Sequence, residues 1–139
     1  MVRRTTRGLP ESDRMQKKEH AHQNRQSRLA LSLTASIAVA ISVLTLTPIT
    51  APEVLTEGSD KLYHIVAFAA LTFPSALLAR SISIPVFCLA VLFAAGIELI
   101  QPSVGRSREW GDFLADVIGA LIGLGAGRLA NRLPFFGDQ

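Results

Sequence analysis

The chain has 139 residues, of which 49% are hydrophobic and only 18% are charged, and its mean hydropathy is +0.34. This composition is too apolar for an ordinary soluble domain, and the length is sufficient for one small helical bundle. The single cysteine, Cys88, excludes an internal disulfide and a cluster of thiolate metal ligands. We therefore expect an integral membrane protein that forms one compact domain.

The net charge of +3 is concentrated near the N-terminus, because eight of the fourteen basic residues lie in residues 1–28. That segment has few apolar residues and cannot bury enough surface to offset its chain entropy, so we predict a disordered basic tail over 1–28. The aromatic side chains that stack on nucleic-acid bases are missing, and we predict no nucleic-acid partner. Membrane topology and attraction to anionic lipids explain the basic residues better.

The first long apolar run covers residues 29–49 and contains several serines and threonines. As a helix it reaches about 31 Å at 1.5 Å per residue, enough to cross a hydrocarbon core of about 30 Å. A cleaved signal peptide is the alternative, but the polar leader before the run is unusually long for one. We favour an uncleaved membrane span.

Three further apolar runs predict transmembrane helices over about 61–79, 84–101 and 112–129. Short polar segments that contain proline or glycine separate these runs. With the first span they predict an all-α domain over 29–133, built as a membrane bundle of four transmembrane helices.

Positive charges outside the spans predict the orientation of the bundle. The tail over 1–28 together with Arg80, Arg128 and Arg132 falls on one side of the membrane, where basic residues outnumber those of the first and third loops. Because cytoplasmic segments carry an excess of Lys and Arg, we predict that both termini lie in the cytoplasm.

Ionisable and amide side chains gather near the ends of the second to fourth spans, which under this topology all lie at the outer face. A charge at the centre of a membrane helix costs about 2.5–3.5 kcal/mol on insertion scales, so these side chains should face inward and pair with one another. The predicted polar cluster consists of Asp60, Lys61, His64, Glu98, Gln101, Arg106, Arg108, Asp112 and Asp116.

The fourth span carries small residues on the same face as its two carboxylates. Asp112 and Asp116 lie one turn apart, and steps of three or four residues continue to Gly119, Gly123 and Gly127. Small residues at this spacing allow close helix contact in membranes, so we expect this face to pack toward the centre of the bundle.

Known catalytic and cofactor motifs are absent: the sequence has no phosphate-binding loop, no dinucleotide-binding glycine pattern, no HExxH and no nucleophile elbow. We therefore predict no catalytic residues and no cofactor. A metal site built from His64, Glu98, Asp112 and Asp116 is chemically feasible. We predict no metal, because nearby guanidinium groups would already neutralise the carboxylates.

The spaced polar residues and glycines also carry a family resemblance. The elements Asp60-Lys61-x-x-His64, Glu98-x-x-Gln101, Arg106 and Asp112-x-x-x-Asp116-x-x-Gly119-x-x-x-Gly123 resemble the VanZ family of small bacterial membrane proteins over about 60–127. Asp116 departs from the family pattern, which often carries Asn there, so the resemblance does not imply an ionised group at this position. The resemblance implies a multi-pass protein of the bacterial inner membrane that acts in the cell envelope.

The founding member of that family is associated with resistance to the glycopeptide antibiotic teicoplanin. We predict a non-catalytic protein with membrane lipids as partners. Its polar pocket at the outer face would bind an anionic lipid or a lipid-linked envelope precursor and affect glycopeptide susceptibility. The alternatives are a membrane-embedded enzyme acting on a lipid headgroup, with a carboxylate or His64 as base, and a proton-linked carrier.

Within the predicted pocket, the loop arginines are the groups suited to an anion. Guanidinium binds phosphate through two parallel hydrogen bonds, so Arg106, aided by Arg108, is the expected ligand-facing cation. We expect Glu98 and Asp112, on the helix ends that flank this loop, to hold Arg106 in place.

Overall fold

The computed structural model describes residues 11–47 and 59–133. The described residues form four long helices: α1 (Glu11–Leu46), α2 (Ser59–Leu78), α3 (Ser83–Ile100) and α4 (Trp110–Ala130). Two short 3₁₀ helices, η1 (Arg80–Ile82) and η2 (Gln101–Val104), follow α2 and α3. There is no strand within these ranges, and the predicted all-α class is confirmed.

All four helices are long and apolar enough to cross a membrane, as predicted. Their outward surfaces carry many large apolar side chains, including Val39, Leu44, Val66, Leu92 and Leu121, each of which is more than half exposed. In water such a surface would drive aggregation, whereas hydrocarbon solvates it. The fold is therefore that of a multi-pass membrane protein.

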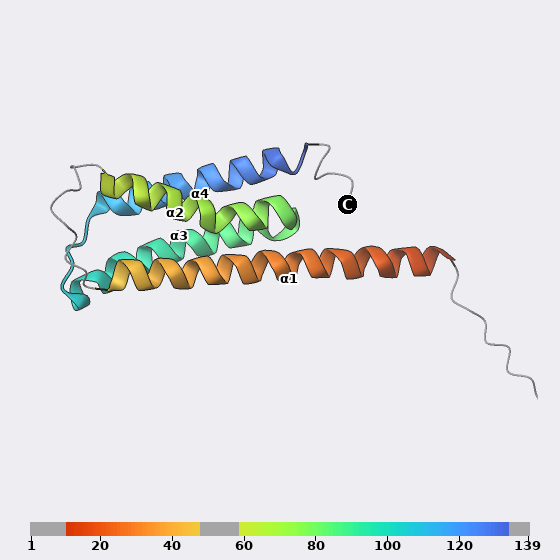
Figure 1. The fold of residues 1–139 in the computed structure, drawn as a ribbon, viewed down its shortest axis with the longest axis horizontal. Helices are drawn as coiled ribbons and strands as arrows, with labels where there is room; N and C mark the ends of the chain where they lie inside the picture. The colour runs from red at the N-terminus through yellow and green to blue at the C-terminus, as the bar shows by residue number, and fades with distance from the viewer. Residues whose placement is uncertain (1–10, 48–58, 134–139) are drawn as a thin grey trace, which may run out of the picture.

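The first helix begins much earlier than the predicted span over 29–49. Residues 11–28, predicted as disordered, continue α1 as an exposed helix, and Figure 1 shows this part extending beyond the other three helices. The segment is rich in Glu, Lys, Gln and Arg, which favour helix. Adding residues to an existing helix avoids the unfavourable nucleation step. Residues 1–10 of the predicted tail and 48–49 of the predicted span lie outside the described residues.

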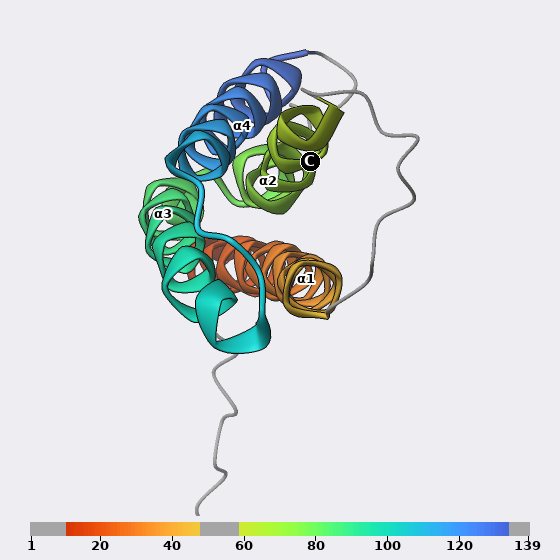
Figure 2. The ribbon, with the colours of Figure 1, turned by 90° about the vertical axis from the view of Figure 1, so that its left-hand side faces the viewer.

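The helices form a bundle in which successive helices run in opposite directions (Figure 1). Seen along the bundle in Figure 2, α2 lies beside both α4 and α1, and α3 lies beside α4 and α1 and also contacts α2. Because α1 to α4 alternate in direction, α2 and α4 run parallel. The end of α1, the start of α2, the end of α3 and the start of α4 meet at one end of the bundle, called the polar end below.

A ridge of glycines brings α4 against the backbone of α2. Gly119 lies on Ile65, where an added Cβ would be 2.8 Å from the Ile65 Cα. One turn further along, Gly123 faces Ala69, and Gly127 continues the ridge toward the far end. Along this line α4 meets the backbone of α2 and only the small side chains of Thr72 and Ala76, so the helix axes approach closely.

Hydrogen bonds and apolar packing hold the same pair of helices. The Thr72 hydroxyl of α2 donates to the Ala120 carbonyl of α4 at 2.8 Å, and Thr72 is fully buried. Beside it, Phe68 and Leu71 of α2 pack with apolar residues of α1, α3 and α4 in the bundle core. The result is a fixed register between α2 and α4, which positions the polar residues at their starts.

The close contact at Gly123 gives a testable prediction. In Gly123→Ala the new Cβ would lie 2.8 Å from the Ala69 carbonyl carbon, so the two helices must move apart. Overpacking of this kind costs about 1–3 kcal/mol. We expect a clearly lower midpoint for thermal unfolding in detergent. Gly125→Ala is the matched control, because nothing lies within 4 Å of its added Cβ. Equal midpoints for the two variants would contradict the packing described.

Candidate polar site

At the polar end, His64 of α2 is paired with a carboxylate of α4. The His64 Nδ1 lies 2.8 Å from the Asp116 Oδ1, and both side chains are buried, with Asp116 fully so. When Asp116 is ionised, its carboxylate can only accept, and Nδ1 carries the proton of this contact. The bond fixes the plane of the imidazole ring and leaves Nε2 as the nitrogen directed toward the polar end.

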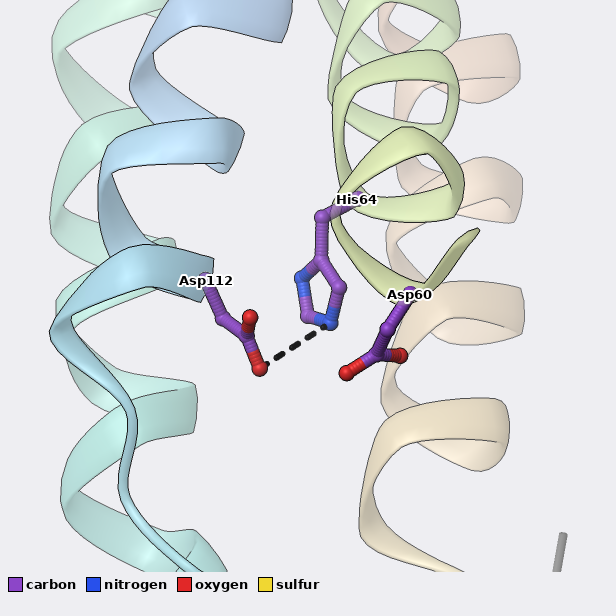
Figure 3. A group of neighbouring side chains, drawn as sticks. All are labelled: Asp60, His64 and Asp112. Atoms are coloured by element: carbon purple, nitrogen blue, oxygen red, sulfur yellow. Dashed lines mark ion pairs between the residues drawn. The ribbon is translucent and has the colours of Figure 1, made fainter. Parts of the chain in front are cut away.

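The Nε2 side of the ring faces two further carboxylates. Asp112, one turn before Asp116 on α4, places its Oδ2 at 3.7 Å from the His64 Nε2. Asp60 lies one turn before His64 on α2, and Figure 3 shows all three side chains converging between the two helices. One ligand atom from each of these three residues lies within 4.8 Å of the others. A neutral imidazole nitrogen and two carboxylates in this arrangement can hold a cation or exchange protons.

Lys61 is the cation that contacts this group directly. Its Nζ lies 3.7 Å from the Asp112 Oδ1 and 3.7 Å from the Glu109 Oε2, and its side chain is about half exposed. Both distances exceed a hydrogen bond. Accordingly, Asp112 Oδ1 has no hydrogen-bond partner in the described part of the chain, although it is buried, and the same holds for Asp116 Oδ2. The site therefore retains acceptor oxygens that the protein itself does not satisfy.

Glu98 and Gln101, at the end of α3, are buried at the polar end but make other contacts. The Glu98 Oε2 accepts a hydrogen bond from the backbone N–H of Glu109 at 3.1 Å, and the Arg108 Nε donates to the Glu98 carbonyl at 3.2 Å. These contacts fasten the loop before α4 to the end of α3. Glu98 Oε1 and Gln101 Oε1 have no hydrogen-bond partner among residues 11–47 and 59–133.

Arg106 does not lie where the sequence analysis placed it. Its Nη1 donates to the carbonyl of Thr45 at 3.1 Å and is 3.5 Å from that of Leu44, in the last turn of α1. Neither Glu98 nor Asp112 forms an ion pair with it in the described structure. The expectation that these carboxylates position Arg106 is wrong, because the open carbonyls and negative dipole end of α1 attract the guanidinium instead.

A groove between α1 and α2 leads to this site from the side of the bundle. Its volume is about 470 Å³, and its walls are mainly apolar, with Ile41 of α1 and Phe68 of α2 among them. Polar groups gather at one end, where Asp60, His64 and Arg106 line it. The groove thus joins an apolar wall to a polar end that carries both signs of charge.

Sequence patterns missed two contributors to the site. The backbone carbonyls of Leu44 and Thr45 hold Arg106 in place. A pattern of side chains does not reveal such carbonyls, and only the predicted end of the helix could have indicated them. Glu109 contacts Lys61 and donates its N–H to Glu98. The position of Glu109 between Arg108 and the start of α4 was the only feature of the sequence that could have indicated this role.

Four candidate membrane helices and a buried polar end define the class of this molecule as a small multi-pass helical membrane protein. The VanZ/LLP1 family model matches residues 8–131, which is most of the chain, so the protein belongs to the VanZ/LLP1 family. The predicted resemblance is thereby confirmed, over a longer range than residues 60–127. No curated protein and no solved structure matches the chain.

Proposed function

We propose that this protein binds an anionic amphiphile, namely an anionic lipid or a lipid-linked envelope precursor, in the groove between α1 and α2. The observation that carries the proposal is the arrangement of apolar side chains along the groove and charged side chains at its polar end. Ile41, Val66 and Phe68 supply an apolar wall, and Arg106 supplies a cation at the polar end. An amphiphile with an acyl or prenyl chain and a phosphate group has the same two parts in the same order.

The geometry of Arg106 supports its role as the headgroup contact. Its two hydrogen bonds to α1 both use Nη1, and within the described part of the chain Nε and Nη2 make no hydrogen bond, so they can donate to a ligand. The carbonyls of Leu44 and Thr45 hold the guanidinium in one orientation, which lowers the entropy lost on binding. Arg108, by contrast, donates to the Glu98 carbonyl and is absent from the lining of this groove, so it is at most a secondary contact.

We further infer that the polar end faces the outer side of the bacterial inner membrane. Arg80 in η1 and Arg128 near the end of α4 lie at the opposite end of the bundle, beside the basic extension of α1. The excess of basic residues at that end favours the cytoplasm. In this orientation the groove opens toward envelope precursors at the outer face, which is the basis for an effect on glycopeptide susceptibility.

Substitution of Arg106 tests the binding proposal. Arg106→Lys keeps the charge but loses the planar fork, so we expect about tenfold weaker retention of phosphatidylglycerol or polyprenyl phosphate in native mass spectrometry, with normal thermal stability. Teicoplanin susceptibility of cells that express the variant should change in parallel.

Arg128→Lys is the matched control for Arg106→Lys. It makes the same exchange at the far end, where Arg128 donates to the Ser83 hydroxyl. Unchanged retention in Arg106→Lys and Arg106→Ala would refute the proposal. A chemically modified lipid in the bound fraction would instead favour the alternative that the protein is a membrane-embedded enzyme acting on a lipid headgroup.

The inferred orientation makes a separate prediction. A cytoplasm-active reporter fused after Gln139 should be active, because positive residues near the end of α4 favour the cytoplasmic side. The measurement is activity compared with a reporter that functions only after export, fused at the same residue. Activity of the exported reporter alone would show that the orientation is inverted.

A further inference from the structure

We propose that Asp60, His64 and Asp112 bind a divalent first-row transition-metal ion at the polar end. The three side chains offer one imidazole nitrogen and two carboxylate oxygens that all lie within 4.8 Å of one another. Figure 3 shows them directed at a common space between α2 and α4. The proposal does not depend on amphiphile binding, because it concerns the protein's own ligand set.

The spacing of the donor atoms suits a metal ion. Bonds of about 2.0–2.2 Å to His nitrogen and carboxylate oxygen place neighbouring ligands of a tetrahedral ion about 3.3–3.6 Å apart. The observed separation of His64 Nε2 and Asp112 Oδ2 is 3.7 Å. Asp60 is exposed at the start of α2, so its side chain can adjust by the remaining distance. One nitrogen with two oxygens suits Zn²⁺ or Mn²⁺.

The contact behind the imidazole is an independent observation that points to a metal. Metal-bound histidines commonly donate their other ring N–H to a carboxylate, which fixes the ring and makes the ligating nitrogen more basic. Asp116 makes this contact at 2.8 Å and is fully buried, and the other ring nitrogen, Nε2, faces Asp112 at 3.7 Å.

An unsatisfied buried oxygen points the same way. Asp112 is 6% exposed, and its Oδ1 lacks a hydrogen-bond partner within the described residues. Leaving a buried carboxylate oxygen unpaired is costly, and a metal ion held by both oxygens of the Asp112 carboxylate would satisfy it. The Lys61 Nζ lies 3.7 Å from this oxygen and only partly compensates its charge. Because the Lys61 side chain is half exposed, it can move away when a metal ion binds.

The arginines do not neutralise the carboxylates of this site, contrary to the expectation from sequence. Arg106 donates to carbonyls of α1, and Arg108 donates to the carbonyl of Glu98. Within the described ranges, no arginine forms an ion pair with Asp60 or Asp112. Glu98, part of the set considered from sequence, bonds to the loop backbone instead. The ligand set is therefore different.

The competing structural explanation is an imidazolium shared between carboxylates. In that arrangement His64 carries a charge, contacts Asp112 and Asp116 from its two nitrogens, and needs no metal. The two explanations differ in measurable ways. A metal site binds one ion with an affinity that depends on Asp60, whereas the imidazolium pair binds none.

The test is equilibrium binding of Zn²⁺ and of Mn²⁺ to the full-length protein in detergent, after removal of any affinity tag and treatment with a chelator. His20 and His22 are exposed on α1, so all measurements use a His20→Ala/His22→Ala background. We expect one ion per chain for at least one of the two metals, with a rise in the unfolding midpoint on binding.

Substitutions that remove one charge show which residues are metal ligands and which only lie near them. We expect Asp60→Asn and Asp112→Asn to weaken binding at least tenfold, and Lys61→Gln to strengthen it by removing a competing positive charge. Glu109→Gln is the matched control, because it exchanges a carboxylate that also contacts Lys61 but lies outside the donor set. It should change affinity less than threefold.

The outcomes divide clearly. Absence of stoichiometric binding in the His20→Ala/His22→Ala background would overturn the proposal. So would equal affinities of Asp60→Asn and Glu109→Gln. If Asp112→Asn fails to fold, Asp60→Asn and Lys61→Gln still decide, since both positions are exposed.

Discussion

The close parallel packing of α2 on α4 is the constraint on which the rest of the structure depends. The glycine ridge lets the backbone of α4 approach Ile65 and Ala69, and the Thr72 hydroxyl fixes the register. With the register fixed, the second turn of α2 faces the first two turns of α4. His64 therefore meets Asp116 inside the bundle. A bulkier ridge would separate the two helices and leave both groups buried without partners.

The placement of polarity explains how such a small bundle can carry a functional site. Carboxylates are costly in hydrocarbon, and those of α2, α3 and α4 all lie at the polar end, where Glu98, Asp112 and Asp116 are buried. The deepest, Asp116, is fully buried and paired with an imidazole, while Asp60 is exposed. Burial thus decreases toward the end of the bundle. The chemistry is protected from lipid yet open to the groove and the membrane surface.

The four spans and the polar end could be predicted because both depend on local patterns. Hydropathy and length identify the helices, and spacing of three or four residues places the α4 carboxylates on the glycine face. The mean position of each polar residue along the membrane normal follows from these two facts. Which helix lies beside which does not follow, because several arrangements of four spans satisfy the same hydropathy.

The errors follow from that missing lateral information. Arg106 was assigned to carboxylates because opposite charges attract, whereas the end of α1 lay nearer and offered open carbonyls. The prediction of no metal relied on the same assignment of the arginines, and it stays a prediction. Residues 11–28 were predicted as disordered because their composition indicates that they cannot fold independently. In the structure they extend a helix that is anchored by its apolar part, and composition does not reveal such an extension.

The most direct test of this account is the protonation of the His64 ring. With His20 and His22 replaced by Ala, ¹⁵N NMR observes one histidine ring in the metal-free protein, since the chain has three histidines. The account predicts a proton on Nδ1 that is hydrogen-bonded to Asp116, and loss of that hydrogen-bond signature in Asp116→Leu, which removes the acceptor. A wild-type ring without a proton on Nδ1 would contradict it, as would a ring signal that is identical in Asp116→Leu.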